Sequence, residues 1–411
     1  MYYINSKEES PDAGYLKFKI EQAVQERGVK LSNSIFTLKK ELTLNKEENL
    51  NFFQNKYGVK NPNSTKQLVS WMEENFTEEE LEACTVKDGK ISTKGELLID
   101  LAHAGNEFAL DLLTYRRETK RLEYVNLMLE CADKYGIVKP EVSLGSTNRI
   151  NYKNPPLMNI PKSILWNVIS PYKEGNVLVS VDIKNQEPWI LINWLGIPEL
   201  KEMIQSNPKG LYNAIYRKVY GSDPNEIQRK ECKTAWNALT YGATKFGLSR
   251  ICKNINGESL YNYFNQIKEL KNYRGKCYAY ATNKVRKTKT YFGTELYPDA
   301  QYKGMLQRQH MDFPIQGTGS DILSLIVAHV DDELEMKKLE NKIELYYSRH
   351  DEIIFEVDGK FFTEKGEAYV IDLIRNLTEH KVDDWEPFQL EINVVEKSTL
   401  GNLEEDEDEE I

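Results

Sequence analysis

Apolar residues in the first third of the chain follow the spacing of amphipathic helices. Between residues 13 and 145 they recur every three or four positions among many charges, as in YLKFKIEQAVQERGV and ELLIDLAHAGNEFALDLLTYRRE. Asn63 and Ser64 stand directly before another such stretch, where a side-chain oxygen can cap the first turn of a helix. This part of the chain is therefore predicted to be mostly helical.

Strand-like runs occur farther along the chain. NVLVSVDI (176–183) reads as a buried strand with Asp182 at its end, YYSRHDEIIFEV (346–357) as two strands joined by a turn, and FQLEINVVE as a further strand. Residues 188–285 are predicted to be mostly helical, and another capped helix is expected to begin near Gly317. The pattern predicts a mixed fold of two or more subdomains.

Two of the predicted strands carry an aspartate at an end. If the strands that bear Asp182 and Asp351 are neighbours in one sheet, the two carboxylates converge and repel each other unless a cation lies between them. Magnesium in proteins is held by one or two carboxylates together with substrate phosphates, which points to phosphoryl or nucleotidyl transfer. Acidic residues are also common in hairpin turns, so an ordinary surface turn explains the HDE triplet equally well on its own.

The stretch RKECKTAWNALTYGATKFG (229–247) supplies cations. Four of its polar or aromatic residues are spaced by four and form one slowly winding stripe on a helix: Arg229, Lys233, Asn237 and Tyr241. Four small or apolar residues are expected on a different face: Cys232, Ala235, Leu239 and Ala243. Two cations followed by an aromatic ring suit a triphosphate and a base, although a solvated amphipathic helix is the simpler interpretation.

Composition narrows the class of protein. The 411 residues are 40% hydrophobic and 29% charged, and no apolar run approaches the roughly 20 residues of a membrane span. The polar N-terminus has no signal-peptide pattern. Five dispersed cysteines without a CxxC pair, and five histidines without HExxH, argue against a zinc site and predict reduced thiols in a cytosol-like compartment.

The net charge of −10 argues weakly against a nucleic-acid partner, but it is concentrated at one end. The C-terminal LEEDEDEEI carries seven acidic residues, and without them the net charge is about −3. We expect this tail (397–411) to be disordered. It is either a solvated end, a contact for a basic partner, or a mimic of DNA.

Five segments in order resemble the polymerase region of family A DNA polymerases, the bacterial polymerase I type. In chain order they are STNRINYKNPPLMNIP, VSVDIKNQEPWILINWLG, RKECKTAWNALTYG, RQHMDFPIQGTGSDIL and HDEIIFEV, within a likeness from about Tyr15 to Glu396. The resemblance implies an α+β right-hand fold with a palm built on an antiparallel sheet, helical fingers and a helical thumb. The implied division is an N-terminal segment and thumb (1–145), palm (146–187), fingers (188–300) and second part of the palm (301–396).

The resemblance also implies a DNA-directed DNA polymerase that adds dNTPs to a primer 3′-hydroxyl by two-metal nucleotidyl transfer. Asp182 and Asp351 would bind two Mg²⁺ ions, for which Mn²⁺ can substitute, and the backbone carbonyl of Ile183 would add a ligand. Glu352 would support the metals, and His350 would lie near the primer terminus.

Roles for the nucleotide and DNA follow from the same resemblance. Arg229 and Lys233 would hold the β- and γ-phosphates, with Lys233 also as a general acid, and Tyr241 would lie near the templating base next to Asn237 on the same stripe. Glu187 would be the gate that excludes a ribose 2′-hydroxyl. The predicted DNA contacts are Arg149, Arg308 and Gln316, with Asn63 and Ser64 in a thumb-like segment.

Several positions depart from the family pattern. In the first motif, Ile183 and Lys184 replace Tyr and Ser, and Trp189 stands where the family often has Arg. In the cationic helix, Asn237 and Ala238 replace an aromatic residue and Gly. Asp312 replaces Asn, and Thr294 and Glu295 stand where arginines are usual. The loss of positive charge predicts a weaker grip on DNA, which a partner protein or low salt would offset. The ring lost at Asn237 predicts altered discrimination against nucleotides without a 3′-hydroxyl.

About 14 residues precede the first thumb-like helix, so we expect no proofreading exonuclease in this chain. The compact size and the NQEPW variant resemble phage-encoded relatives. The expected partners are primer–template DNA, dNTPs and a separate exonuclease or processivity protein; the expected state is a cytoplasmic monomer without membrane contact. Two alternatives stay open: a single-subunit RNA polymerase, and a degenerate polymerase serving as a DNA-binding or replisome assembly module, as the drift at Lys184, Trp189 and Asn237 would allow.

Overall fold

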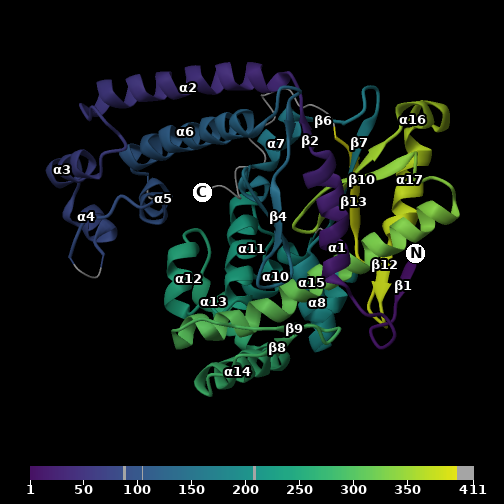
Figure 1. Ribbon diagram of the computed structural model, residues 1–411. Coiled ribbons are helices and arrows are strands. Elements are labelled where there is room, and N and C mark those ends of the chain that lie inside the picture. Colours follow the sequence, from purple (N-terminus) through teal and green to yellow (C-terminus); the bar gives the residue numbers. More distant parts are fainter. Residues whose placement is uncertain (87–88, 104, 207–209, 396–411) are drawn as a thin grey trace. The chain divides into compact units, whose positions relative to one another are not determined.

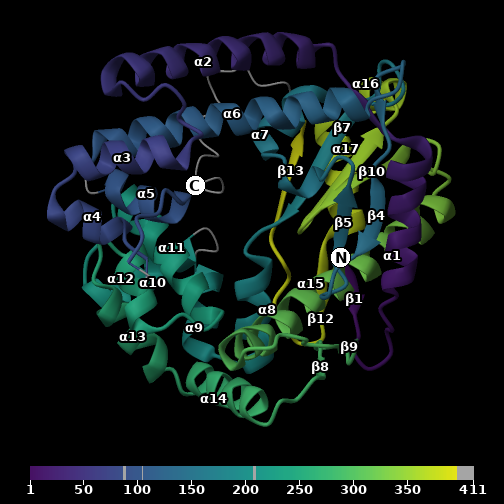
Figure 2. The same ribbon diagram turned by 60° about the vertical axis from the view of Figure 1, so that its left-hand side comes forward.

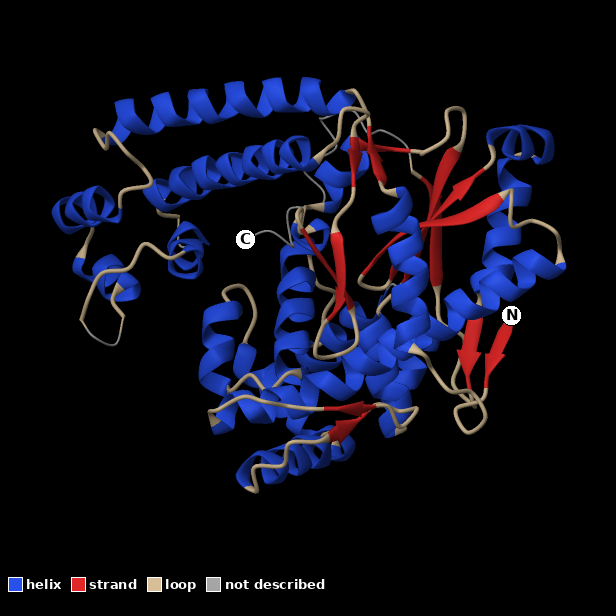
Figure 3. Cartoon of the chain, in the orientation of Figure 1, coloured by secondary structure: helices blue, strands red, loops and turns tan. Residues whose placement is uncertain are grey.

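The computed structural model describes residues 1–86, 89–103, 105–206 and 210–395, so the acidic tail lies outside the described residues. The chain forms two compact units. The sheet unit comprises Met1–Arg27, Val142–Asn151 and Pro171–Val395, and the helical unit contains Gly28–Glu141 and Tyr152–Ser170. Helices predominate in both (Figure 3). Among the described helices, none is both long and apolar enough to cross a membrane.

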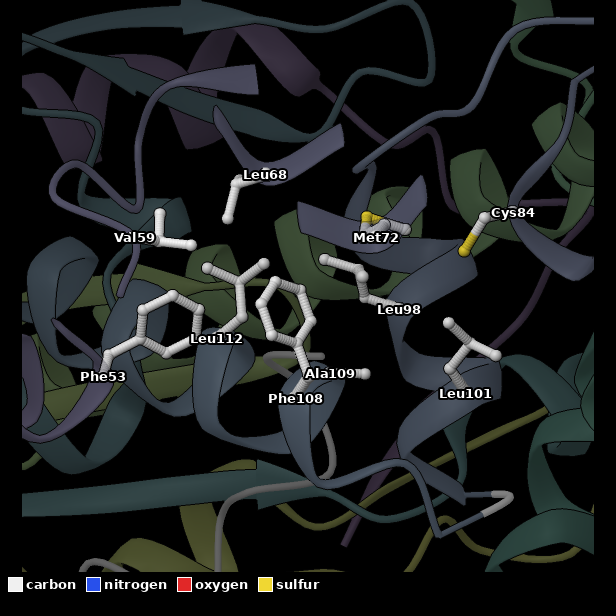
Figure 4. Close-up of a cluster of buried hydrophobic side chains, with 10 residues drawn as sticks. All are labelled: Phe53, Val59, Leu68, Met72, Cys84, Leu98, Leu101, Phe108, Ala109 and Leu112. Atoms are coloured by element: carbon white, nitrogen blue, oxygen red, sulfur yellow. The ribbon is translucent and has the colours of Figure 1, made fainter. Parts of the chain in front are cut away.

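The helical unit is built on two long helices, α2 (Ser34–Tyr57) and α6 (Glu107–Cys131), which lie side by side (Figures 1 and 2). Their apolar faces and those of three shorter helices enclose a core that includes Phe53, Leu68 and Phe108 (Figure 4). Trp71 stacks on Phe108 with ring centroids 4.1 Å apart. The other elements of this unit are α3 (Thr65–Asn75), α4 (Glu78–Cys84), α5 (Gly95–His103), α7 (Lys162–Val168), the 3₁₀ turn η2 (Leu157–Asn159) and the sheet β3 (Ile137–Val138), β2 (Val29–Leu31), β6 (Ile169–Ser170).

The predicted cap at the start of α3 is confirmed for Ser64. Its Oγ accepts a hydrogen bond from the backbone N–H of Gln67 at 3.4 Å, which satisfies one of the four unpaired N–H groups of a helix start. The mainly helical character predicted for residues 13–145 is confirmed as well.

The sheet unit contains a four-stranded antiparallel sheet in the order β10–β11–β7–β13. The runs predicted as strands are these four: β7 (Val177–Ile183), β10 (Ile343–Arg349), β11 (Glu352–Val357) and β13 (Leu390–Val394). The register pairs Val181 with Ile353 and Val179 with Phe355, whereas Asp182 pairs with Glu352. Because successive side chains alternate between faces, one face of the sheet is apolar and the other carries the acidic residues.

Helix α15 (Lys303–Met336) packs beside the apolar face together with the N-terminal segment. Val327 and Val330 of α15 line one cavity with Phe355 of β11, and α15 contacts both α1 and α17. Strand β1 (Tyr2–Ile4) pairs in parallel with β12 (His380–Val382), so residues 1–27 belong to the sheet unit, whereas the sequence analysis grouped them with the thumb. The other helices in this part of the sheet unit are α1 (Ala13–Ile20), the π-helix η1 (Glu21–Arg27), α16 (Gly359–Lys365) and α17 (Glu367–Thr378).

One sequence prediction is wrong in α15, which begins fourteen residues before Gly317 and runs through Pro314. Proline has no N–H to bond the carbonyl four residues earlier, here that of His310. The thiol of Cys277 in α14 (Lys268–Thr282) contacts this carbonyl at 3.4 Å, and the hydroxyl of Tyr273 donates to the next carbonyl, that of Met311, at 2.7 Å. A neighbouring helix thus satisfies the backbone that the proline leaves free.

Residues from 186 to 282 form a helical region within the sheet unit, as predicted. In α11 (Glu226–Thr240), Cys232, Ala235 and Leu239 are buried, which confirms the predicted apolar face, but Ala243 lies beyond the end of the helix. The region comprises α8 (Gln186–Leu195), α9 (Pro198–Ser206), α10 (Leu211–Tyr220), α12 (Lys245–Ile251), α13 (Gly257–Gln266) and α14 (Lys268–Thr282), followed by β8 (Thr288–Lys289) and β9 (Glu295–Leu296). The hairpin of β4 (Glu141–Leu144) and β5 (Ile150–Lys153) contributes its turn to this unit.

A buried carboxylate fixes the loop that leads into β7. Glu356 of β11 accepts hydrogen bonds from the backbone N–H groups of Tyr172 and Lys173 at 3.1 and 2.9 Å, and from Asn176 Nδ2 at 2.9 Å. Bonds to a charged acceptor are stronger than neutral ones, and donors left unpaired in a buried site are costly. Glu356 therefore anchors the start of the strand that carries Asp182.

We expect Glu356→Gln to lower the free energy of unfolding by about 1–3 kcal/mol, because the amide removes the charge and turns a donor toward other donors. Chemical denaturation followed by circular dichroism measures this. Glu340→Gln, at an exposed glutamate of the same unit, is the matched control and is expected to have no effect. Equal stability of the two variants would contradict the anchoring role.

Candidate active site

The HDE triplet forms the connection between β10 and β11. Arg349 pairs with Glu352, so His350 and Asp351 are the two residues of a tight hairpin turn. His350 has a φ of +51°, a left-handed conformation that histidine adopts more readily than most residues. The carbonyl of Asp351 accepts a hydrogen bond from the N–H of Ile183 at 3.1 Å, which ties the turn to the end of β7. The prediction that the strands bearing Asp182 and Asp351 are neighbours in one sheet is confirmed.

The two aspartates influence each other electrostatically. Burial, and after it the charge of Asp182, together raise the pKa of Asp351 to about 7. Burial and the like charge of a neighbour both disfavour two ionised aspartates, and a cation bound between them would offset this. The two carboxylates are therefore suited to binding a cation together.

Asp182 lies in a row of acidic residues across the sheet. Its neighbours in the register are Glu352 on β11 and Glu391 on β13, and like charges in directly opposite positions destabilise a sheet. Glu352 is buried and accepts a hydrogen bond from the hydroxyl of Ser180. Lys184 contacts Asp182 and Glu391. Glu391 and Ser180 were missed by sequence reasoning, although an acidic residue in the predicted strand FQLEINVVE was a usable signal for Glu391.

The donor set suits a hard divalent cation. Aspartate oxygens are ligands that Mg²⁺ prefers, and a magnesium site completes its shell with water and substrate phosphates rather than with many side chains. Accordingly, no group of three or more metal-ligating His, Cys, Asp or Glu side chains occurs in the described part of the chain. Asp182 and Asp351 fit one or two Mg²⁺ ions on these grounds, and they do not form a closed protein cage.

A second cluster centres on Glu187, in the first turn of α8. Its carboxylate accepts hydrogen bonds from Arg149 in the β4–β5 turn and from the hydroxyl of Tyr241, the residue that ends α11. Burial and then the charge of Glu187 raise the pKa of Tyr241 far above its usual value, so the hydroxyl remains a donor. Three segments distant in the sequence thus meet at one carboxylate.

Helix α15 borders this cluster with three residues spaced by four. Asp312 has a buried Oδ1 without a hydrogen-bond partner, and burial followed by the charge of Glu187 raises its pKa to about 6. Gln316 lies one turn later, partly buried. Arg308 lies one turn earlier and is exposed, and a Cβ atom added at Gly242 would lie 3.6 Å from its Cγ. The structure therefore brings Arg149, Glu187, Tyr241 and Asp312 together, with Arg308 beside Gly242.

The cationic stripe of α11 is present as predicted. Arg229 is partly buried and Lys233 is exposed, one turn apart on the helix. Asn237, a turn before Tyr241, accepts a hydrogen bond from the hydroxyl of the buried Tyr212 at 3.1 Å. A partly buried amide is thus engaged where the family pattern has an aromatic ring.

Asn63 and Ser64 belong to the helical unit. The Nδ2 of Asn63 donates to the hydroxyl of Tyr115 at 3.2 Å, and Ser64 caps α3. Both side chains have local structural partners, and their contact with DNA stays a prediction. His350 is exposed at the tip of its turn.

An antiparallel sheet with two aspartates at the adjoining ends of its strands, in one unit with a helix that presents Arg and Lys in a row, is the arrangement expected of the right-hand polymerase class. The family model for DNA polymerase family A matches residues 32–395. The chain belongs to DNA polymerase family A.

Individual proteins agree with this assignment. The chain is 26% identical over 321 residues to DNA polymerase I of Rhizobium leguminosarum, covering 71% of this chain and 30% of that protein. It is 24% identical to DNA polymerase theta of Drosophila melanogaster over 66% of this chain and 14% of that protein. The chain thus spans about 30% or less of the length of these relatives.

The solved structure of the POL domain of Pol1 from M. smegmatis, in complex with DNA primer–template and dNTP, superposes with a TM-score of 0.75. It is 21% identical in sequence, and the match covers 92% of this chain and 69% of that one. The α+β right-hand fold predicted from the sequence is confirmed.

Proposed function

We propose that this chain catalyses template-directed DNA synthesis, adding dNTPs to the 3′-hydroxyl of a primer by nucleotidyl transfer. The observation that carries the proposal is the position of Asp182 and Asp351 on adjoining segments of one sheet, where the charge of one raises the pKa of the other. Family membership supplies the class of reaction. Its partners would be primer–template DNA and the four dNTPs. The protein would act in the cytoplasm.

Asp182 and Asp351 would hold two Mg²⁺ ions, with the carbonyl of Ile183 as a further oxygen ligand and Mn²⁺ as a substitute. When bound, the ions would lower the pKa of the primer hydroxyl and neutralise charge on the triphosphate. Glu352 keeps its carboxylate fixed through Ser180 and adds negative charge beside the pair. His350, exposed at the turn, would lie near the primer terminus.

The α11 side chains would act on the triphosphate. Arg229 and Lys233 would bind the β- and γ-phosphates, and Lys233 would give a proton to the leaving pyrophosphate. Tyr241, at the end of the helix, would border the templating base.

Glu187 would discriminate deoxyribose from ribose. Its carboxylate is held by Arg149 and Tyr241 at once, so it cannot turn aside easily to admit a 2′-hydroxyl. This supports DNA rather than RNA synthesis. Arg149, Arg308 and Gln316 would contact primer or template, and Asn63 and Ser64 the duplex. The division into thumb (1–145), palm (146–187 and 301–396) and fingers (188–300) remains part of this proposal.

The proposal is tested by extension of a labelled primer on a DNA template with Mg²⁺, using dNTPs or, separately, rNTPs. Extension with dNTPs alone is expected. Extension with rNTPs would remove Glu187 from its gate role, and no extension by a protein that still binds DNA would favour the assembly module.

We expect Asn237→Tyr to change the discrimination between dideoxynucleotides and deoxynucleotides, because a ring replaces the amide that contacts Tyr212. The measurement is the ratio of kcat/KM for the two nucleotides. Tyr212→Phe removes the same hydrogen bond without adding a ring, so it separates the two causes. An unchanged ratio in Asn237→Tyr would contradict the prediction.

A further inference from the structure

Lys184 is the first residue after β7 and lies beside Asp182. Its Nζ is 3.6 Å from Asp182 Oδ1 and also contacts Glu391 Oε2. Glu391 is the residue of β13 directly opposite Asp182. One ammonium group therefore joins two carboxylates that the antiparallel register places side by side.

The backbone fixes this position. The N–H of Lys184 donates to the carbonyl of Gln389 at 2.9 Å, and the next residue, Asn185, adopts a left-handed conformation with φ of +51° before α8 begins. A lysine side chain in contact with two carboxylates carries a positive charge at neutral pH.

This charge lies next to the carboxylate that would bind a divalent cation. A cation bound there would be repelled by an ammonium group a few ångströms away, and the ammonium already compensates part of the carboxylate charge. The side chains of Lys184, Asp182 and Glu391 are 35%, 24% and 39% exposed, so Lys184 can move away without unfolding the sheet. Glu391 offers it a partner in that case.

We propose that Lys184 is a built-in counter-ion of Asp182 that competes with the divalent cation and so sets the metal concentration at which the site fills, while Glu391 draws the ammonium away when metal enters. Lys184 is a positioning residue, since it acts through Asp182. The inference rests on the proposed function in taking Asp182 and Asp351 as the metal ligands.

The test is a Mn²⁺ titration of the full chain without DNA or nucleotide, with free Mn²⁺ followed by electron paramagnetic resonance. Lys184→Met and Lys184→Ser are expected to bind Mn²⁺ about 3- to 10-fold more tightly than the wild type. Lys173→Met removes one positive charge that pairs with Glu344 elsewhere in the unit, and it controls for net charge. Its affinity is expected to equal that of the wild type.

Glu391→Gln is expected to change the Mn²⁺ affinity in the opposite direction. Without its second partner Lys184 stays on Asp182, so Mn²⁺ affinity is expected to fall about 2- to 5-fold. In the double variant Lys184→Met/Glu391→Gln this loss should vanish relative to Lys184→Met if Glu391 acts through the lysine. A loss that persists would mean that Glu391 attracts the metal directly, which overturns the role given to it.

Unchanged or weaker Mn²⁺ binding in both Lys184 variants would overturn the inference while leaving the proposed function standing. Failure of the proposed function has a different signature: Asp351→Asn would then bind Mn²⁺ as the wild type does, and the inference would fall with it. In extension assays, Lys184→Met is expected to reach half-maximal rate at a lower Mg²⁺ concentration.

Discussion

Asp351→Asn is expected to reduce primer extension by at least about 10³-fold while the protein stays folded. A metal site that stabilises transition-state charge contributes several kcal/mol, and each 1.36 kcal/mol is about a factor of ten in rate. Asparagine keeps the size of the side chain but supplies one neutral oxygen where the carboxylate supplied charge. The hydrogen bond from Ile183 goes to the backbone carbonyl of residue 351, so the substitution leaves it in place.

The stability of this variant follows from the direction of the pKa shift. Folding raises the pKa of Asp351 to about 7, so above the unfolded pKa its ionisation disfavours the folded state. This penalty grows as the pH rises from the unfolded value toward the folded one. Asparagine has no such penalty, and the melting temperature at pH 8 with EDTA is expected to be equal to or higher than that of the wild type.

Single-turnover incorporation in Mg²⁺, with the melting temperature measured on the same preparation, checks both expectations. Asp372→Asn is the matched control, because this aspartate of α17 is exposed on the same unit. It is expected to retain wild-type rate. More than a tenth of wild-type activity in Asp351→Asn would remove this residue from the metal site.

The sequence was sufficient to predict those elements whose signal lies in a short stretch of the chain. The run 177–183 is rich in β-branched residues and mostly buried, and the HDE turn separates two further runs of this kind, so the strands and the pairing of their acidic ends could be predicted. The stripe on α11 depends only on helical spacing. The order of the five motifs then matched one polymerase family, and both the family model and the solved structure agree with that assignment.

Features that depend on distant partners could not be predicted. Pro314 normally signals a helix boundary, and the partner of the carbonyl that it leaves free in α15, the thiol of Cys277, lies 37 positions earlier in the chain. The pairing of β1 with β12 brings residues 2–4 to residues 380–382, and no short-range pattern announces it. Lys184 was visible as a departure from the family pattern, but its two carboxylate partners required the strand register.

Lys233→Ala is expected to lower the rate of nucleotide incorporation by about 10²- to 10³-fold, with a smaller effect on DNA binding. Removing one donor that stabilises developing charge, or one general acid, has an effect of this size. Lys233 is exposed on α11, where a triphosphate can reach it. Lys230→Ala, on the same helix and paired with Glu226 at 3.6 Å, is the matched control and is expected to change the rate less than about threefold.

Lys233→Arg separates the two roles of the side chain. Arginine keeps the positive charge but cannot release its proton at accessible pH, so it can bind phosphates without acting as an acid. If proton transfer matters, the variant binds dNTP with near wild-type affinity but stays slow. If charge alone matters, arginine restores most of the rate that alanine removes. Wild-type rates in Lys233→Ala would instead exclude the residue from the phosphate site and leave Arg229 as the cation of the stripe.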